Sequence, residues 1–497
     1  MTVQKEIFRE YDIRGAADTQ LTDEISRAIG QAYASFILEK GVDQIVVGAD
    51  NRVSSPRIKT AVIDGVVSQG VSVVDIGTAV TPMVYFAGYH LNLDGGIQVT
   101  ASHNPAEDNG IKMREKKKPL FVGGTQMIYE RIIAAGPASA LFRATAGKPV
   151  TSSPHSVSAS PVGGSPAAGV SSKDISEDYI KRITRGIKLG RKLKVVVDTG
   201  NGTGGLFVRR ILDMLGVDAT VLFEESDGTF PNHTPNPQEV DDYGQLQIKV
   251  REIGADVGIA LDGDCDRMNA TDETGTFLGG DKLAVLFSRE VLRSHKGAGV
   301  VINPVMSQAI FDDVESAGGK GYFGKVGYPN IESRMRETGA LMGVESSGHF
   351  FFGDDYYGYD DALYAMVRLL SFVSQSTESV TDILADMPRY VSTPEYRVDV
   401  RGTNPDVRKF DMVSEVTKAF QDEKYDVNTI DGARVTFPDR SSRGRSANGR
   451  GWGIVRASNT QPKLSMRFES KTEKGLGEIQ RIFREKLKEY REIKVEF

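Results

Sequence analysis

The chain has little of what several classes of protein require. Its single cysteine, Cys265, excludes an internal disulfide and any zinc site built from several thiolates. It has no apolar run of about 18 residues, the length that a membrane-spanning helix needs. Lys and Arg number 61 against 67 for Asp and Glu, and the net charge of −6 argues against a protein that binds nucleic acid by neutralising phosphates. The N-terminal residues carry acids where a signal peptide needs an apolar run, so we expect a cytoplasmic protein.

What the chain does contain is typical of a large globular enzyme. Hydrophobic residues make up 39% and charged residues 26% of the 497 positions, which are ordinary values for a chain with packed cores. Glycine is abundant, at 53 residues, and indicates many tight turns and places where the backbone approaches a ligand. At about 150 residues per domain, this length predicts about three or four domains.

Helix and strand patterns alternate along most of the chain. Thr22 is placed to cap a helix that reaches Ile37, and residues 44–48 then read as a short buried strand. The same alternation returns twice, which predicts mostly parallel sheets with right-handed crossovers. After Pro394 the patterns change to those of antiparallel strands with a closing helix, so the last domain is predicted to be α+β.

These patterns divide the chain into five segments. One stretch is rich in Ser, Pro, Gly, Ala and Val without a helix or strand period, and is predicted to be a low-complexity linker or insertion. The predicted segments are an α/β domain at 1–144, this linker at 145–172, α/β domains at 173–275 and 276–394, and an α+β domain at 395–497.

The first candidate site is the segment 100–105, Thr-Ala-Ser-His-Asn-Pro, which follows a predicted parallel strand. Open α/β sheets place ligand sites at the carboxyl ends of such strands. Ser102, beside His103, can be a nucleophile or a phosphate carrier. By itself the segment fits equally well a serine that caps a helix next to a structural histidine.

The second candidate site is the segment Asp262-Gly-Asp264-Cys-Asp266-Arg267. Alternate spacing in an extended loop turns the three carboxylates to one side, where they repel one another unless a cation joins them. Oxygen ligands without histidine favour a hard cation, in the first place Mg²⁺. The alternatives are a solvated acidic turn and an EF-hand calcium loop with Glu273 in twelfth place. The calcium loop is rejected because Arg267 occupies its sixth position, which must be glycine.

Two further segments have weaker signals of their own. Glu345 and Ser347, again after a strand, project to one side and can hold two sugar hydroxyls, although such a pair also begins many helices. The segment 456–462, Arg-Ala-Ser-Asn-Thr-Gln-Pro, offers a guanidinium, hydroxyls and backbone N–H groups to a phosphate. A plain β-turn is the alternative there.

A serine, a hard-metal loop, a hydroxyl-binding loop and a phosphate cradle are the parts needed to move a phosphoryl group on a sugar phosphate. With these motifs the sequence resembles the α-D-phosphohexomutase family, over nearly the whole chain and with one motif per domain in the family's order. The resemblance implies an α/β fold of three similar mixed α/β domains plus a C-terminal α+β domain around a central cleft.

The resemblance also implies roles for individual residues. Ser102 becomes the phosphoserine of the active enzyme and binds Mg²⁺ together with the three aspartates. The implied metal ligands are Ser102, Asp262, Asp264 and Asp266. The implied catalytic residues are Ser102, His103, Lys112, Arg14 and Arg267, where Arg14 belongs to the segment Tyr-Asp-Ile-Arg-Gly and Lys112 to the segment Asn-Gly-Ile-Lys. The implied substrate-binding residues are Lys325, Tyr328, Glu345, Ser347, His349, Arg456, Ser458, Asn459 and Thr460.

Two positions depart from the family's pattern. Cys265 stands in the metal loop where glycine is common, so its side chain must point away from the metal. Tyr328 stands where several relatives carry histidine, which leaves one acid/base or hydroxyl contact undecided.

The implied function is that of an isomerase and intramolecular phosphotransferase of the phosphomannomutase/phosphoglucomutase group. It interconverts hexose 1-phosphate and 6-phosphate through a phosphoserine and a 1,6-bisphosphate, with glucose or mannose 1,6-bisphosphate as activator. The segment His-Phe-Phe-Phe at 349–352 favours the mannose and glucose group. The alternatives are a phosphoglucosamine mutase, a metal-dependent phosphatase with a serine intermediate, and a non-catalytic sugar-phosphate binder. We expect hexose phosphates as partners, no nucleic acid or membrane, and a monomer or homodimer.

Overall fold

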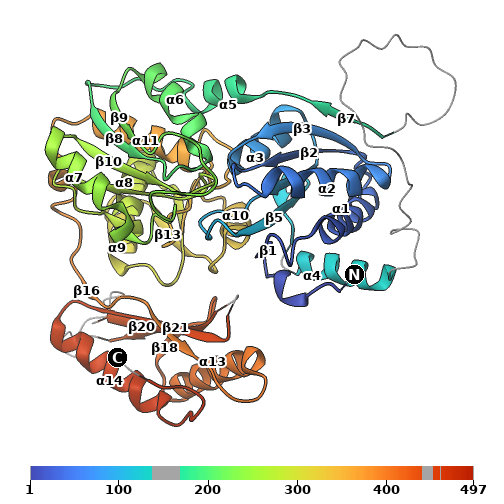
Figure 1. Cartoon of the computed structure of the whole chain (residues 1–497). Helices are drawn as coiled ribbons and strands as arrows, with labels where there is room; N and C mark the ends of the chain where they lie inside the picture. Colours follow the sequence, from blue (N-terminus) through green and yellow to red (C-terminus); the bar gives the residue numbers. More distant parts are fainter. Residues whose placement is uncertain (1, 122, 137–167, 439–450, 459–460, 496–497) are drawn as a thin grey trace. The chain divides into compact units, whose positions relative to one another are not determined.

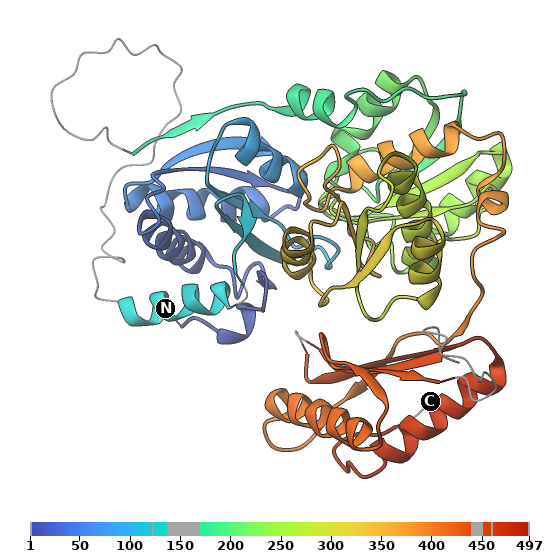
Figure 2. The ribbon, with the colours of Figure 1, turned by 180° about the vertical axis from the view of Figure 1, so that it is seen from behind.

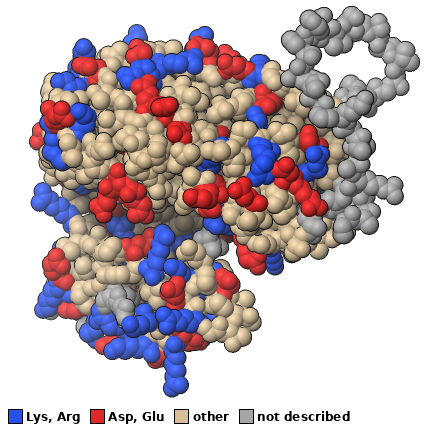
Figure 3. Space-filling view, in the orientation of Figure 1, with Lys and Arg blue, Asp and Glu red and all other residues tan. Residues whose placement is uncertain are grey.

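The structure is a computed structural model that describes residues 2–121, 123–136, 168–438, 451–458 and 461–495 (Figure 1). It divides into two compact units, of which the first comprises Met1–Tyr179 with Asp227–Thr229 and the second Ile180–Ser226 with Phe230–Phe497. Among the helices described, none has the length and apolar character that a bilayer crossing requires. Acidic and basic side chains are interspersed over most of the face seen in Figure 3, as their similar numbers suggest.

The first unit contains one sheet, which we call domain I. Its strands are β1 (Ile13–Ala16), β2 (Gln44–Ala49), β3 (Ser72–Thr78), β4 (Gly95–Val99), β5 (Asp108–Glu115), β6 (Lys118–Pro119) and β7 (Val170–Ser172). Its helices are η1 (Lys5–Ile7), α1 (Asp23–Leu38), α2 (Ser55–Ser68), α3 (Thr81–His90) and α4 (Gly124–Ala135). The strand order is β1-β5-β4-β2-β3-β7, and β6 pairs with β5. Strands β4, β2, β3 and β7 are parallel, whereas β5 runs antiparallel to both of its neighbours in this order.

Helices cover both faces of this sheet. One face packs against α1, α2 and α4 in a continuous apolar core that includes Ile45, Val47 and Ile97. The other face carries Gly48, and a Cβ there would lie 2.8 Å from a methyl of Val84 in α3. The predicted helix cap is confirmed, because the Thr22 hydroxyl accepts the N–H of the third helical residue.

Domains II and III of the second unit each contain a four-stranded sheet. Domain II contains β8 (Lys194–Asp198), β9 (Asp218–Leu222), β10 (Val257–Leu261), β11 (Met268–Thr271), η2 (Thr203–Leu206), α6 (Val208–Leu215), η3 (Val240–Tyr243) and α7 (Gly244–Ile253), and α5 (Ser176–Ile183) leads into it. Domain III contains β12 (Gly299–Ile302), β13 (Lys320–Phe323), β14 (Met342–Val344), β15 (Phe350–Phe352), α8 (Gly279–Ser294), α9 (Gln308–Ser316), α10 (Tyr328–Thr338), α11 (Ala362–Ser374) and α12 (Val380–Ile383). The strand orders are β11-β10-β8-β9 and β15-β14-β12-β13.

The three α/β domains share one strand arrangement. In each, three parallel strands lie in the order third, first, second, and an antiparallel strand pairs with the third. The loop that joins this hairpin carries Ser102 in domain I, the three aspartates in domain II, and Glu345 with Ser347 in domain III. Three of the four sequence motifs therefore occupy the same topological position.

Domain IV is an antiparallel sheet with two helices. It contains β16 (Val391–Ser392), β17 (Tyr396–Asp399), β18 (Asp426–Asn428), β19 (Ala433–Phe437), β20 (Gly451–Ala457), β21 (Lys463–Ser470), α13 (Pro405–Asp422) and α14 (Glu473–Leu487). The strand order is β16-β21-β20-β19-β18, and β17 also pairs with β21. Both helices pack on one face, where Phe420 and Phe483 lie in the core (Figures 1 and 2). The predicted fold class of three similar α/β domains and one α+β domain is confirmed.

The segment predicted to be a linker, 145–172, differs from the prediction at its C-terminal end. Val170–Ser172 form β7, which pairs in parallel with β3, and the N–H of Val73 donates to the carbonyl of Gly169. The strand forms because the outer edge of β3 offers backbone partners, which no local pattern reveals. Residues 137–167, with the rest of that segment, lie outside the described part of the chain.

Candidate functional site

The serine loop of domain I is a strained turn between β4 and β5. Ser102 is fully buried and has a φ of 54°, a left-handed conformation that costs a serine free energy and marks a tight functional turn. Its N–H donates to the hydroxyl of Thr100 at 2.9 Å. Its Oγ lies 3.1 Å from Nδ1 of His103. The serine and the histidine that the sequence predicts therefore have hydrogen-bonding contact with each other.

Arg52 holds this loop in place, and the sequence analysis missed it. Its side chain is fully buried and its Nε donates to the carboxylate of Asp50. Nη2 donates to the carbonyls of Ser102 and Asn104, both at 2.7 Å, and Nη1 donates to those of Pro105 and Asp108. All five N–H groups of one guanidinium are thus engaged, three of them on backbone carbonyls of the serine loop and one on the carbonyl of the first residue of β5. The available signal was the place of Arg52 just after β2, at the same carboxyl edge as the serine.

Arg14 and Lys112 lie next to the serine loop on the antiparallel strands. Arg14, in β1, donates from Nη1 to the carbonyl of Ala101 at 3.2 Å and to the side chain of Asn104 at 3.0 Å. Its Nε pairs with Asp12 at 2.7 Å. Lys112, in β5, is 3% exposed and lies opposite a residue of β4 in the ladder. Domain I therefore places the guanidinium of Arg14 against the serine loop, and Lys112 in the strand that follows this loop.

The metal loop between β10 and β11 brings its three carboxylates together. Asp262, Asp264 and Asp266 are all buried, and each offers an oxygen within 4.8 Å of the other two. The N–H of Arg267 donates to Oδ1 of Asp262 at 3.1 Å, which fixes the turn. Three converging oxygen donors in a buried loop suit Mg²⁺. The predicted convergence of the three carboxylates is borne out, but the segment is a turn with Cys265 in a left-handed conformation and not the extended loop from which convergence was predicted. The identity of the cation stays a prediction.

Cys265 adopts the geometry that its position demands. Its φ of 58° is the left-handed conformation that glycine adopts without strain. Its thiol turns toward Gly204, where a Cβ would approach Sγ to 2.7 Å, and it contacts the carbonyl of Asp262 at 3.7 Å. Burial raises the pKa of this thiol well above its usual range, and the neighbouring carboxylates raise it further. A thiol that stays protonated does not compete for the cation.

The sugar loop between β14 and β15 contacts the metal loop. His349 is buried, and its Nδ1 lies 3.0 Å from a carboxylate oxygen of Glu345 and 2.9 Å from the hydroxyl of Ser347. Its Nε2 lies 3.3 Å from Asp266 and 3.1 Å from Nε of Arg267. The two predicted sugar-binding residues therefore share one histidine, and that histidine reaches a predicted metal ligand.

The charge state of His349 follows from these neighbours. Burial and the guanidinium of Arg267 lower its pKa, but Asp266 and Glu345 outweigh them and raise it to about 9. His349 thus lies between two buried carboxylates that would otherwise repel each other.

The loop 324–328 of domain III joins the sugar loop to domain IV. The N–H of Gly327 donates to Glu345 at 2.6 Å, and the N–H of Val326 donates to Asp431 at 3.2 Å. Asp431 also accepts from Nε of Arg456 at 3.0 Å. Asp431 was missed in the sequence, because nothing local distinguishes it from a surface acid.

Of the other predicted substrate-binding residues, Tyr328 is buried at the start of α10, with its ring 6.4 Å from that of His349. Lys325 is half-buried in the loop that precedes it. Ser458 ends the described part of the phosphate loop, and its N–H donates to Lys463. Asn459 and Thr460 lie outside the described residues.

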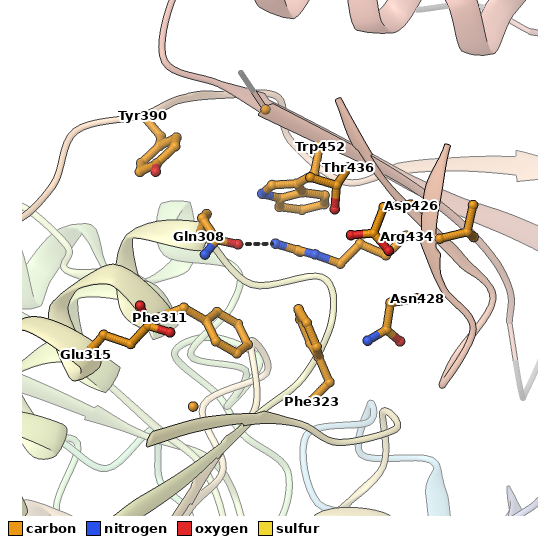
Figure 4. Close-up of a pocket in the computed structure, with 13 residues that line it drawn as sticks. Gln308, Phe311, Glu315, Phe323, Tyr390, Asp426, Asn428, Arg434, Thr436 and Trp452 are labelled. Atoms are coloured by element: carbon orange, nitrogen blue, oxygen red, sulfur yellow. Dashed lines mark hydrogen bonds between the residues drawn. The ribbon is translucent and has the colours of Figure 1, made fainter. Parts of the chain in front are cut away.

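A cavity of about 450 Å³ lies where domain IV meets domain III (Figure 4). Arg434 of β19 crosses it and donates to the carbonyl of Pro304 at 2.6 Å and to the side chain of Gln308 at 3.2 Å. Its guanidinium lies 3.6 Å from the ring centroid of Trp452. Glu469 accepts from the indole N–H of that residue at 2.7 Å and from the N–H of Gln308 at 2.8 Å. Buried polar side chains thus orient domain IV on the loop that follows β12.

Within the second unit, the contacts form one connected path. It runs from Arg456 through Asp431 and the loop 324–328 to Glu345, and through the buried His349 to Asp266. The phosphate, sugar and metal loops are therefore coupled to one another. The serine loop is organised separately, within the first unit.

Comparison with known proteins agrees with this arrangement. Family models described as phosphoglucomutase/phosphomannomutase match the chain in order: the α/β/α domains I, II and III match residues 5–136, 177–275 and 279–390, and the C-terminal domain matches residues 400–486. The chain belongs to the phosphoglucomutase/phosphomannomutase family.

Relatives of similar length support the family assignment. A phosphomannomutase/phosphoglucomutase of Pseudomonas putida is 34% identical over 97% of this chain and 95% of its own. A phosphoglucomutase of Neisseria meningitidis is 34% identical over 97% of this chain and 96% of its own. The crystal structure of a family member from Burkholderia thailandensis, 32% identical, superposes with a TM-score of 0.83 over 98% of both chains. The predicted family and enzyme class, a mutase that transfers phosphate within its substrate, are confirmed, and these relatives do not favour the phosphoglucosamine mutase or phosphatase alternatives.

Proposed function

We propose that this chain interconverts hexose 1-phosphate and hexose 6-phosphate, with mannose and glucose as the sugars, through a phosphoserine at Ser102 and a 1,6-bisphosphate. The observation that supports it most is the connected path from Arg456 through Glu345 to Asp266. Along this path a phosphate cradle, a hydroxyl-binding loop and a metal loop follow one another. A phosphosugar presents its remote phosphate, its ring hydroxyls and its reacting oxygen in the same order.

The metal loop fits Mg²⁺, held by Asp262, Asp264 and Asp266 together with the phosphate of Ser102. The fit rests on three buried carboxylates whose oxygens converge and on a thiol that turns away from them. When bound, the cation neutralises charge on the phosphoryl oxygens and so makes the serine a better leaving group. The cation is thus the positive charge of the site that no side chain supplies.

The chain's own residues carry the rest of the transfer. The sugar hydroxyl oxygen forms a bond to phosphorus, the bond between phosphorus and Oγ of Ser102 breaks, and the hydroxyl loses its proton. His103, which contacts that Oγ, transfers this proton to the departing serine oxygen, and Lys112 and Arg14 stabilise the oxygens that carry the charge. Phosphoryl transfer depends mainly on such positioning and charge neutralisation. The bisphosphate then turns, and its other phosphate returns to the serine.

Sugar selection follows from which hydroxyls are read. We assign Glu345 and Ser347 to the hydroxyls at positions 3 and 4, which mannose and glucose share, so both sugars are accepted. Added glucose or mannose 1,6-bisphosphate acts as activator because it restores the phosphate on Ser102. Sugar phosphates of this kind are metabolites of the cytoplasm, where we place the chain as a monomer or homodimer.

The test compares mannose, glucose and glucosamine 1-phosphates side by side, with and without EDTA, and follows phosphate on the serine by mass spectrometry. We expect turnover of the first two sugars, loss of activity in EDTA and recovery on adding Mg²⁺. Ser102→Ala should lose nearly all turnover, whereas the control Ser68→Ala, whose hydroxyl bonds a carbonyl in α2, should keep it. An active alanine variant at position 102, or preference for the glucosamine substrate, contradicts the proposal.

A further inference from the structure

A buried Asp–His pair lies in domain II outside every motif discussed above. Asp198 ends β8 and is fully buried, and its Oδ1 lies 3.1 Å from Nε2 of His233, whose side chain is 7% exposed. Nδ1 of the same ring lies 2.9 Å from the carbonyl of Thr234. Both ring nitrogens thus face hydrogen-bond acceptors, an arrangement that only the doubly protonated ring satisfies in full. The other charged or titratable groups that act on it are Asp242 and Tyr243.

The aspartate of this pair organises a glycine-rich loop that supports the metal loop. Oδ1 of Asp198 accepts the N–H of Gly200 at 2.9 Å, and the loop that begins there is Thr-Gly-Asn-Gly-Thr-Gly-Gly at 199–205. From this loop the N–H of Thr203 donates to the carbonyl of Gly263 at 2.9 Å. A Cβ on Gly202 would lie 3.0 Å from the Cα of Gly263. The glycine-rich loop therefore packs directly against the backbone between two predicted metal ligands.

The histidine reaches the metal loop by a second route. Its ring centroid lies 4.5 Å from that of Tyr243, which is fully buried. The hydroxyl of Tyr243 donates to the carbonyl of Leu261 at 3.1 Å, and this residue immediately precedes Asp262. The pair of Asp198 and His233 thus supports both the start and the middle of the metal loop.

Domain I contains the equivalent arrangement. Asp50 follows β2, the strand that corresponds to β8, and its Oδ1 accepts the N–H of the residue two places later, just as Asp198 does. In domain I that later residue is Arg52, whose guanidinium pairs with Asp50 and holds the serine loop. In domain II the corresponding residue is Gly200, which has no side chain. His233 supplies the missing cation from a different loop.

We propose that Asp198 and His233 form a positioning pair that holds the metal loop in the arrangement that binds a divalent cation. The proposal rests on the proposed function insofar as the three aspartates bind that cation. The contacts of both residues are with the glycine-rich loop and with Tyr243, so we infer that the pair acts through the metal loop's backbone. Outer residues that orient metal ligands typically contribute about 10- to 100-fold in metal affinity.

The test is the affinity of the full chain, stripped of metal, for Mg²⁺ by calorimetry and for Mn²⁺ by electron paramagnetic resonance. His233→Phe keeps a ring beside Tyr243 but removes the charge, and we expect about tenfold weaker binding of both ions. His233→Gln can still donate to Asp198, so it should recover most of this loss. The matched control is His90→Phe, because His90 also lies against an aromatic ring, that of Phe86, and lies 3.2 Å from an aspartate, but belongs to domain I. It should bind both ions as the unaltered chain does.

Four outcomes decide between the explanations. Weaker binding in His233→Phe with an unchanged control and recovery in His233→Gln supports the pair. Unchanged binding in His233→Phe, while Asp262→Asn abolishes it, overturns the pair and leaves the metal loop intact. No binding of either ion by the unaltered chain overturns the metal assignment itself. If His233→Phe does not fold, Asp198→Asn replaces it, since an amide still accepts the N–H of Gly200, and unchanged binding in that variant overturns the pair.

Discussion

The sharpest prediction concerns Arg52, since one side chain determines the shape of the serine loop. Arg52→Lys keeps the positive charge but reduces the N–H donors from five to three. At least two of the five acceptors, which are Asp50, three loop carbonyls and the first carbonyl of β5, therefore lose their partner. At about 1.5–3 kcal/mol for a hydrogen bond from a charged group, the loss is about 3–6 kcal/mol. Domains are stable by only about 5–15 kcal/mol, so the first unit should be strongly weakened.

The effect on catalysis should be larger than stability alone explains. A displacement of about 1 Å in a reacting group costs about 100-fold in rate, and the carbonyl of Ser102 is held by the guanidinium that the lysine lacks. We expect kcat to fall about 100-fold. Hydrogen–deuterium exchange of residues 100–108 should accelerate even where the variant remains folded.

The control is Arg57→Lys in the same domain. Arg57 donates to two carbonyls and pairs with Asp23, but its side chain is 35% exposed and lies outside the serine loop. It should leave kcat and the exchange of residues 100–108 unchanged. The reasoning fails if Arg52→Lys also leaves kcat and the exchange of residues 100–108 unchanged, because the five hydrogen bonds of Arg52 would then not position the serine loop.

Three further predictions follow from the second unit. Arg456→Ala should raise KM for the hexose phosphate much more than it lowers kcat, because a remote phosphate is held equally in the ground and transition states. Steady-state kinetics in which kcat falls more than KM rises would contradict this role of Arg456. Cys265→Gly should leave activation by Mg²⁺ unchanged and keep Tm within a few degrees of that of the unaltered chain. The change relieves about 1 kcal/mol of left-handed backbone strain, which offsets the lost packing of a buried thiol. Zinc found on the thiol by elemental analysis would refute this prediction. The Asp198 carboxylate raises the pKa of His233 above its ordinary 6.5 against the opposing effect of burial. The ion pair therefore stabilises the fold fully below pH 6.5 and is lost as pH rises through the higher folded pKa. The difference in unfolding free energy between the unaltered chain and His233→Gln, measured by urea unfolding, should shrink as pH rises above 6.5, and a difference that grows would contradict this sign.

The sequence was sufficient for the elements whose pattern is local. Apolar runs such as 194–198 and 257–261 predict strands, and the residues that follow them predict loops at one sheet edge, because parallel strands share a direction. Ser102 and the aspartates were found for this reason. Their alternate spacing in an extended loop also predicted that the carboxylates converge, but the structure brings them together through a turn in which Cys265 is left-handed.

What the sequence did not reveal depends on contacts between distant residues. Arg52 lies 50 residues from the serine whose loop it holds, and Asp431 accepts from Arg456 out of the turn between β18 and β19. Strand β7 consists of three exposed residues, and its pairing is decided by the free edge of β3 and not by its own composition. His233 acts only through the partners that folding gives it. The helix or strand periodicity of a local segment does not reveal such contacts between distant residues.

Because Trp452 stacks on Arg434, its fluorescence can report on the contact between domain IV and domain III. Trp452 is the only tryptophan of the 497 residues, so excitation at the red edge of the absorption band addresses one indole in one place. That indole lies beside a cation and donates to Glu469, at the surface that domain IV turns toward Gln308. Separation of domain IV from domain III would admit water to the ring and shift its emission to longer wavelength. Docking of the fourth domain can therefore be followed in stopped flow, without a label and without a substitution.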